Sequence, residues 1–334
     1  MTIDDVARES GVNVSTVSRA LGGVYGVHKS TRERVVAVAA RLGYRPNRVA
    51  RSLVTGRSHT LALIVSDIRN PFFAEVARGA EDAARAGGCD LILCNSDLDN
   101  VKQMQYVESL LEKRVDGILM NSVWALDKQQ QRRLASCGRP IVLLNRAAPR
   151  SAFCTVSADN EHGGALAAAY LRKLGHRHIA HLSGPRRHGN MTGRTNGFVR
   201  ALAEGPDPIE PVVLHGSNSF TGGRDLTRKL LDTHPDTTAI FAANDIMAFG
   251  VIRELMTAGR RIPRDVSVIG FDDVELASVV HPPLTTIHQP THEIGKAAVE
   301  ILLRLAGGVN AAPEHRLFGV TLVERESCQR YTKS

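Results

Sequence analysis

Polar side chains stand directly after several short apolar runs in the sequence. These positions hold planar amides, carboxylates or a guanidinium, namely Asn70, Asn121, Asn145, Arg146, Asn244, Asp245 and Asp272, and the aromatic residues Phe72 and Phe73 stand beside the first of them. Such planar groups bracket adjacent hydroxyls, and rings cover apolar faces, so the set suits a neutral polyhydroxylated ligand. Taken singly, each residue is more often a helix cap or turn residue, and Asp245 in particular looks like the cap of its helix. Together they predict a small-molecule binding site.

No reacting group accompanies these side chains. The sequence has no GxGxxG after a strand-like run, no GxxxxGK[ST] and no GxSxG, which disfavours dinucleotide, nucleotide and hydrolase chemistry. His176, His178 and His181 form HxHxxH, but residues 178 and 181 fall on opposite faces of a strand, and no Cys or carboxylate follows at ligand spacing. We therefore expect no catalytic residue, no metal and no cofactor. A sugar-modifying enzyme with a basic appendage stays a distant alternative, which turnover of a bound sugar would reveal.

The elements that would position the polar residues begin at about residue 59. Strand-like runs lie at 61–65, 91–93, 117–120, 141–144, 179–182, 239–242 and 266–269. Helical stretches lie at about 72–87, 100–113, 127–137, 162–174, 193–203, 221–233, 245–258 and 291–306. Strands that are buried on both faces and alternate with helices indicate an α/β core of two doubly wound parallel-sheet halves. Ligands of such sheets bind outside the carboxyl ends of the strands.

The first 58 residues differ from the rest in charge. They hold ten Lys/Arg and four Asp/Glu, whereas the remaining 276 residues hold 32 and 30. A local basic excess of this kind is expected of a nucleic-acid-binding module attached to a nearly neutral sensor or enzyme. The segment therefore predicts a polyanionic partner.

Three short helices are predicted within this basic segment. The first begins with a capping box at Thr2 and Asp5 and ends at Gly11, the second is capped by Asn13 and spans 14–21, and the third spans about 31–42. This is the pattern of an all-α helix-turn-helix domain over residues 1–45. A major groove admits one helix, and the second helix offers Val14, Ser15, Thr16, Ser18 and Arg19 for contacts to bases and phosphates. A three-helix protein-interaction domain with incidental basicity is the alternative.

We expect residues 46–58 to form a hinge helix and linker after this domain. Pro46 suits the first turn of a helix, and Val49 and Leu53 share one face, but a helix this short is marginal in water. Arg45, Arg48 and Arg51 suggest a polyanion as its partner. An ordinary basic linker is the alternative.

The sequence predicts a cytoplasmic protein without a membrane partner. No run approaches the roughly 20 apolar residues of a membrane span, and the first residues lack a signal-peptide pattern. The five cysteines are an odd number without a CxxC pair, which favours reduced thiols.

The basic segment resembles the lactose/galactose-repressor family. The resemblance rests on Thr2-Ile3-x-Asp5-Val6-Ala7, Thr16-Val17-Ser18-Arg19-Ala20-Leu21, Thr31-Arg32-Glu33-Arg34-Val35, Leu42-Gly43-Tyr44-x-Pro46-Asn47 and Ala50-Arg51-Ser52-Leu53. Gly22 stands where the family usually has Asn, and His28 where a Ser usually caps the third helix. The resemblance implies that Val14, Ser15 and Arg19 read the operator. It adds Asn47, Arg51 and Leu53, of which Leu53 is similar to the leucine that wedges into the minor groove of a palindromic site.

The rest of the chain is similar to the type I periplasmic-binding-protein core of these repressors. The motifs are Asn70-Pro71-Phe72-Phe73, Asn145-Arg146, Asp159-Asn160, Arg194-xx-Gly197-Phe198, Asn244-Asp245, Gly270-Phe271-Asp272-Asp273 and Leu284-Thr285-Thr286-Ile287. On matched positions, the effector contacts would be Asn70, Phe72, Phe73, Asn121, Asn145, Arg146, Arg194, Phe220, Asn244, Asp272 and Gln289. The set looks more like ribose-binding proteins than the purine repressor, with Asn145 where pentose binders carry Asp.

The resemblance also implies a split core and a function. An N-subdomain would hold about 59–158 and 290–318, and a C-subdomain about 162–285 and 323–330. The implied protein is a homodimeric transcriptional repressor of sugar uptake or catabolism genes, which leaves double-stranded operator DNA when a small, pentose-like sugar binds. A corepressor-dependent regulator that responds to a nucleobase or another metabolite stays open.

Overall fold

The computed structural model describes residues 1–22, 26–44, 56–121, 126–145, 151–186, 189–309 and 312–332 of the 334-residue chain. The chain divides into two compact units, Met1–His59 and Thr60–Ser334. No helix in the described ranges is long and apolar enough to cross a membrane.

The first unit contains the three predicted helices, α1 (Ile3–Ser10), α2 (Val14–Leu21) and α3 (Lys29–Arg41). The capping box at Thr2 is confirmed, and Gly11 ends α1 with a left-handed backbone at φ 63°. The cap of α2 is confirmed as well, since the Asn13 side chain accepts a hydrogen bond from the Thr16 N–H at 2.8 Å. These caps satisfy backbone groups that a short helix otherwise leaves open.

A small core holds the three helices together. Val6, Val17 and Val35, one from each helix, are fully buried in it. Helix α3 begins two residues before the predicted start, and His28 precedes it without a side-chain cap; its Nδ1 pairs instead with the Ser30 hydroxyl at 2.9 Å. The predicted hinge helix over 46–53 lies outside the described residues.

The second unit contains two six-stranded sheets. The first has the order β11-β5-β4-β3-β1-β2, with all neighbours parallel. Its strands are β1 (Thr60–Val65), β2 (Asp90–Asn95), β3 (Gly117–Asn121), β4 (Ile141–Leu144), β5 (Cys154–Ala158) and β11 (His315–Phe318). Its helices are α5 (Phe72–Ala86), α6 (Asn100–Glu112), α7 (Lys128–Ala135) and α13 (Thr291–Ala306). We call this sheet with its helices the first lobe.

The second sheet has the order β12-β10-β9-β8-β6-β7, and only the β10–β12 pair is antiparallel in it. Its strands are β6 (Ile179–Ser183), β7 (Val212–His215), β8 (Ala239–Ala242), β9 (Ser267–Asp272), β10 (Thr285–His288) and β12 (Thr321–Val323). Its helices are α8 (Asn160–Lys173), α9 (Gly189–Ala203), α10 (Phe220–Thr233), α11 (Asp245–Thr257) and the short α12 (Leu276–Val279). These elements form the second lobe.

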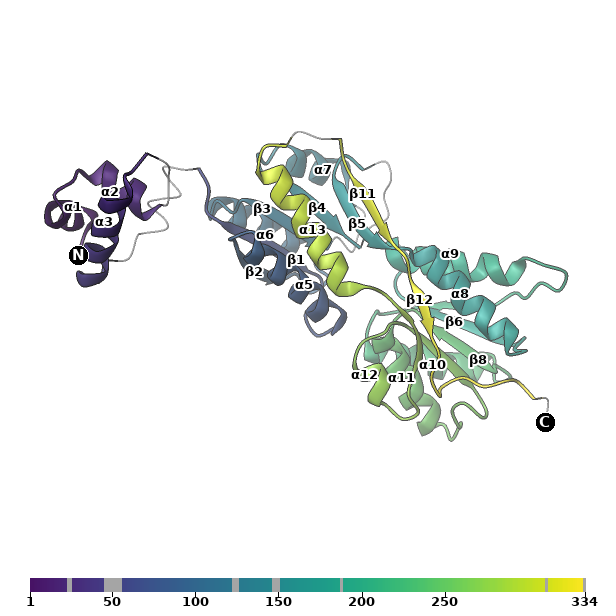
Figure 1. Ribbon diagram of the computed structural model, residues 1–334. Helices are drawn as coiled ribbons and strands as arrows, with labels where there is room; N and C mark the ends of the chain where they lie inside the picture. Colours follow the sequence, from purple (N-terminus) through teal and green to yellow (C-terminus); the bar gives the residue numbers. More distant parts are fainter. Residues whose placement is uncertain are drawn as a thin grey trace. The chain divides into compact units, whose positions relative to one another are not determined.

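The chain passes between the two sheets three times. It leaves the first sheet between β5 and α8, returns between β10 and α13, and crosses again between β11 and β12. Figure 1 shows the last crossing as the yellow path of β11 and β12, and it shows α13 lying with the strands of the first lobe although it is late in the sequence. Each lobe is therefore assembled from separate stretches of sequence.

All predicted helices and strands of the core occur within a few residues of their expected bounds. The prediction missed β5, β7, β10, β11, β12 and α12 as elements. Strands β7, β11 and β12 lie at sheet edges and are only partly buried, so they lack the continuous apolar run that marks a central strand.

Candidate functional site

A cavity that is partly open to solvent lies between the two lobes, beyond the carboxyl ends of their strands, and its empty space, open solvent included, is about 350 Å³. Its lining residues from the first lobe are Ser66, Asn70, Phe72, Phe73, Asn121 and Asn145, and those from the second lobe are Asn190, Met191, Arg194, Asn218, Asn244 and Asp272. The location is the one expected for open parallel sheets. The structure thus brings eight of the eleven predicted effector-contact residues together: Asn70, Phe72, Phe73, Asn121, Asn145, Arg194, Asn244 and Asp272.

The first-lobe wall consists of two aromatic rings, three amides and the Ser66 hydroxyl. Phe72 and Phe73 pack edge to face, with 5.0 Å between ring centroids. The Asn70 side-chain amide oxygen accepts a hydrogen bond from the Phe72 N–H at 3.0 Å, and the Asn121 side-chain amide donates to the Ser66 hydroxyl at 2.9 Å. Each bond uses only one end of the amide, so the other end can serve a ligand.

Asn145 stands at the end of β4 with a left-handed backbone, φ 53°. Its backbone N–H donates to the Val156 carbonyl at 2.8 Å. The side-chain amide forms no hydrogen bond with another residue in the described ranges, although the residue is only 7% exposed. Asn tolerates this backbone region better than most residues, and the amide is left with both donors and acceptor for a ligand.

Arg194 is the cationic residue of the second-lobe wall, and it is 4% exposed. Its Nε donates to the Asn160 amide oxygen at 2.8 Å, one terminal nitrogen donates to the Ala243 carbonyl, and the guanidinium carbon lies 3.6 Å from the Phe271 ring centroid. Helix α9 brings it there by close packing on α8, since a Cβ at Gly197 would lie 1.8 Å from the Glu161 carbonyl oxygen. Stacking and bidentate geometry are properties of arginine that lysine does not share.

Asp272 faces this guanidinium from the end of β9. Its Oδ1 lies 3.5 Å from a terminal nitrogen of Arg194 and accepts a 2.7 Å hydrogen bond from the Gln289 amide. Burial raises the pKa of Asp272 to about 6, while Arg194 and Gln289 act in the opposite direction. Burial also lowers the pKa of Arg194. Both protein contacts use Oδ1, so Oδ2 is the acceptor left for a ligand.

The interpretation of Asp245 as a helix cap was wrong. Asn244 has the extended backbone of a cap (φ −155°, ψ 171°), and its side-chain amide oxygen accepts a hydrogen bond from the Met247 N–H at 2.8 Å. The Asn244 amide also donates to Asn218 at 2.6 Å. Asp245 is the first residue of α11, and it is fully buried.

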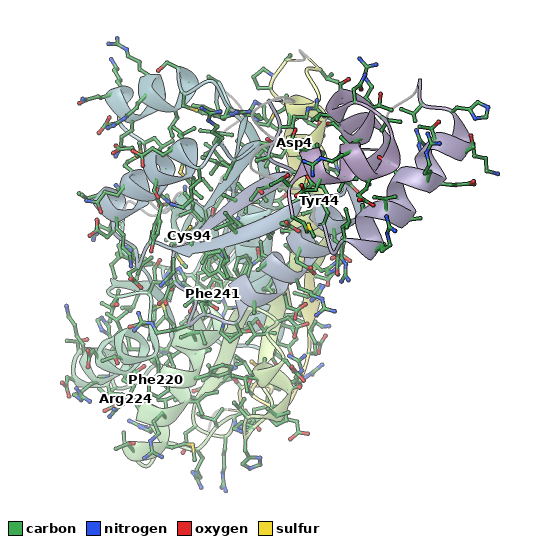
Figure 2. All side chains as sticks on the ribbon, turned by 90° about the vertical axis from the view of Figure 1, so that its left-hand side faces the viewer. Asp4, Tyr44, Cys94, Phe220, Arg224 and Phe241 are labelled. Carbon is green, nitrogen blue, oxygen red and sulfur yellow. The ribbon has the colours of Figure 1, made fainter. Side chains whose placement is uncertain are left out.

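Two of the predicted residues in the described ranges, Phe220 and Gln289, do not line the cavity. Phe220 is 42% exposed at the start of α10 and is labelled in Figure 2 near Arg224 of the same helix. Gln289 reaches the site through its bond to Asp272. Arg146 lies outside the described residues.

Sequence reasoning missed Ser66, Asn190, Met191 and Asn218. Asn218 follows β7, which the apolar pattern did not reveal, and α9 begins four residues before the predicted start, so Asn190 and Met191 fall outside the predicted helix. The only available signal was the run of asparagines at the ends of neighbouring strands.

The three histidines of the HxHxxH pattern lie in separate environments. His176 bonds to Thr238 and to the Gln329 carbonyl, His178 pairs with Asp236, and His181 bonds to the Phe241 carbonyl and Thr195. Burial lowers the pKa of His181 to about 4. Each ring therefore has its own partners.

The second candidate site is the exposed face of α2. Val14 is 38% exposed, and Ser15, Ser18 and Arg19 are exposed as well, while Val17 and Ala20 face the core. The Ser15 and Thr16 hydroxyls both donate to the Asn13 amide oxygen, at 2.8 and 2.7 Å. The face thus offers an apolar group, hydroxyls and a guanidinium, which are suitable for base edges and phosphates. The other predicted DNA contacts, Asn47, Arg51 and Leu53, lie outside the described residues.

Known proteins share both parts of the chain. Residues 2–47 match the family described as bacterial regulatory proteins, lacI family, and residues 168–328 match a periplasmic binding protein-like domain. The chain is 38% identical to the HTH-type transcriptional repressor PurR of Vibrio cholerae over 336 residues, which cover 100% of this chain and 99% of that protein. It is 34% identical to the ribose operon repressor of Halalkalibacterium halodurans over 303 residues, or 91% and 89% of the two chains.

Solved structures agree with these relatives. The lac repressor dimer bound to operator and the anti-inducer ONPF superposes with a TM-score of 0.88 at 31% identity, over 98% of this chain and 99% of that chain. A LacI family regulator from Enterococcus faecium with bound ribose gives 0.73 at 32% identity, over 82% and 100%. These proteins are DNA-binding regulators rather than enzymes. With its helix-turn-helix unit and two-lobed core, this chain belongs to the lacI family of bacterial regulatory proteins and is a DNA-binding transcriptional regulator.

Proposed function

We propose that the chain is a repressor of sugar uptake or catabolism genes, and that a small neutral sugar, with a pentose favoured, releases it from a palindromic operator. The composition of the cavity wall carries this proposal. Its two charges, Arg194 and Asp272, compensate each other, and six asparagines plus a serine supply the remaining polarity. A charged ligand would find no uncompensated counter-charge among the described lining residues, whereas hydroxyl groups would find donors and acceptors.

The free hydrogen-bonding groups support a polyhydroxylated ligand. Asn70 and Asn218 keep amide donors, Asn121 keeps an acceptor, and Asp272 keeps Oδ2. The Phe72 and Phe73 rings supply the apolar cover for one sugar face. The ribose bound to the Enterococcus faecium regulator and the ribose operon repressor among the relatives add support for a pentose.

The DNA-binding side of the proposal uses α2 and the linker. Val14, Ser15, Thr16, Ser18 and Arg19 would contact the major groove, and Asn47, Arg51 and Leu53 of the 46–58 segment would contact the minor groove. Such a regulator would act in the cytoplasm. One helix buries too little surface for useful specificity, so two copies on paired half-sites are needed.

Exposed apolar side chains offer a surface for the second copy. In the first lobe, Leu93 on edge strand β2 is 42% exposed and Val101 on α6 is 67% exposed. In the second lobe, Met256, Leu276 and Val279 are each about half exposed or more. Edge strands with apolar side chains are normally covered. A homodimer covers them, and the lac repressor relative was solved as a dimer.

The proposed switch couples the cavity to DNA binding. A sugar that contacts both walls stabilises the arrangement in which the lobes enclose it. The sugar binds this closed arrangement more tightly than the DNA-binding arrangement. The ratio of those two sugar affinities sets how far the operator affinity falls. The hinge segment would transmit the difference because the core determines whether its two copies can meet.

Fluorescence anisotropy with a labelled fragment of the protein's own promoter tests the proposal. The titration is repeated with D-ribose, D-xylose, L-arabinose, D-glucose, hypoxanthine and guanine, at two salt concentrations. We expect operator affinity to fall steeply with salt and to weaken with one of the pentoses. If none of the six compounds changes the affinity, the effector proposal is wrong.

A corepressor mechanism is the second candidate because PurR of Vibrio cholerae is 38% identical over the full chain. In this case hypoxanthine or guanine would tighten operator binding and the pentoses would have no effect. The same titration therefore distinguishes the two functions by the sign of the change.

A further inference from the structure

Asp245 is a fully buried carboxylate that does not line the cavity. Its two oxygens accept hydrogen bonds from neutral donors, the Thr286 hydroxyl at 2.6 Å and the Val274 N–H at 2.9 Å. No ion pair involves it among the described residues. Burial, together with nearby Asp272, raises the pKa of Asp245 well above its ordinary value. Burying an ionised carboxylate without a cation costs folding free energy. The groups that Asp245 binds therefore indicate what role the residue has.

One carboxylate oxygen of Asp245, Oδ2, bonds to the turn that places Asp272 at the cavity. Asp272 and Asp273 both have positive φ, 123° and 60°, and neither is a glycine. Such a backbone persists only when its surroundings fix it. Oδ2 of Asp245 accepts the N–H of Val274, the next residue along. This bond therefore ties the residue that follows the strained turn to Asp245.

The other carboxylate oxygen of Asp245, Oδ1, bonds to strand β10. Thr286 donates to Oδ1 of Asp245, and three residues later Gln289 donates to Oδ1 of Asp272 at 2.7 Å. Gly270 on β9 leaves the room for this, because a Cβ there would lie 2.2 Å from Oδ1 of Asp245. One carboxylate thus fixes the turn that carries Asp272 and the strand that carries its partner Gln289.

We infer that Asp245 is a positioning residue, which acts through Val274 and Thr286 to hold Asp272 and Gln289 in the geometry that binds the effector. The inference rests on the proposed effector function of the cavity. It assigns Asp245 a role other than ligand contact, and it makes the β10 strand, which continues into a crossing between the lobes, part of the binding site.

The main test compares Asp245→Asn with wild type in the full-length protein. Hydrogen exchange of the peptide spanning residues 271–275, measured without any sugar, reports the Val274 N–H directly. We expect exchange there to be at least about tenfold faster in the variant, and D-ribose affinity measured by calorimetry to fall at least about tenfold. Operator affinity without sugar should be unchanged. Wild-type exchange together with wild-type affinity would overturn the inference.

Matched variants separate positioning from a general loss of folding. Thr286→Val removes only the hydrogen bond from residue 286 to Asp245 and should lower the affinity for D-ribose two- to fivefold. Thr286→Ser keeps the hydroxyl and should have the wild-type affinity. Asp127→Asn changes another helix-start carboxylate, at α7 in the first lobe, and should alter neither readout. If Asp245→Asn does not fold, the Thr286 pair decides, because equal affinities of the Val and Ser variants would refute the role.

Failure of the proposed function has a different signature. If wild type binds no D-ribose, calorimetry is repeated with the other five compounds of the promoter titration. Faster exchange of the 271–275 peptide in Asp245→Asn would then still support the positioning role, while the sugar proposal alone would fail.

Discussion

The two lobes share a parallel-sheet architecture but furnish the cavity in different ways. The first lobe contributes Ser66, two phenylalanines and three asparagines, and none of these six residues ionises. The second lobe contributes a buried ion pair, and its members are tied to Asn160, Gln289 and Ala243 by hydrogen bonds. In the first lobe, by contrast, the Asn145 amide has no hydrogen-bonding partner in the described ranges.

This difference predicts that the two lobes contribute unequally to effector affinity. Groups that are already fixed lose little freedom on binding, so the second lobe should supply most of the effector affinity. The amides of the first lobe must order around the ligand and contribute less each. The rings of the first lobe supply cover, since the described lining of the second lobe contains no aromatic residue.

The largest effect is expected for Asp272→Ala. Sugar affinity should fall at least about 100-fold (~3 kcal/mol), because the variant removes the acceptor and leaves Arg194 buried without its anion. The free energy of unfolding should fall by about 3 kcal/mol for the same reason. Calorimetry and urea unfolding measure the two quantities. Operator affinity at 25 °C should be retained, and loss of DNA binding as well would show that Asp272 is needed for folding rather than for the ligand.

The pH dependence of stability should come from the second lobe. The folded-state pKa of Asp272, about 6, is above its ordinary value of 3.8, so the folded protein binds more protons than the unfolded chain between those values. The contribution of Asp272 is then fully present below about pH 4 and is lost as pH rises through 6. The stability of wild type relative to Asp272→Asn should therefore fall as the pH rises from 4 to 7.

Urea unfolding of both proteins at several pH values measures that difference. Asn145→Gly is the matched first-lobe control, and its stability relative to wild type should not depend on pH in this range. A parallel shift of wild type and Asp272→Asn with pH would contradict the assignment.

Asn145→Gly also sharpens the comparison on the ligand side. Glycine adopts the left-handed backbone without steric cost, so the variant removes the amide and keeps the β4 turn. Sugar affinity should fall about 5- to 10-fold (~1 kcal/mol), and the unfolding midpoint should stay nearly constant. A loss as large as that of Asp272→Ala would show that the lobes contribute equally.

Strands could be predicted from the sequence where the run of apolar residues was continuous. Site residues could be predicted where polar residues directly followed such a run. Central strands such as β1 and β9 are buried on both faces, so their pattern is unambiguous. Edge strand β7 is only half buried, and with it the cavity residue Asn218 was missed. Asp245 was misjudged by a single residue, because a sequence of two cap-forming residues, Asn244-Asp245, does not say which one has the extended backbone.

Phe220 shows the limit of a resemblance. It was expected among the effector contacts on matched positions alone, and the structure leaves it 42% exposed at the start of α10, outside the cavity lining. No feature of the local sequence distinguishes an aromatic residue that covers a ligand from one that faces solvent. Only the position of α10 relative to the strand ends decides this.

The smallest effect is therefore expected for Phe220→Leu, with Phe72→Leu as its partner in the first lobe. If the rings that cover the sugar come from the first lobe, Phe72→Leu should weaken sugar binding about 5-fold and Phe220→Leu less than 2-fold. Calorimetry with the same sugar gives both numbers. A loss of 5-fold or more for Phe220→Leu would mean that α10 brings its ring over the ligand in the bound state. The second lobe would then supply cover as well as charge, and the difference between the two walls would hold only for the unliganded protein.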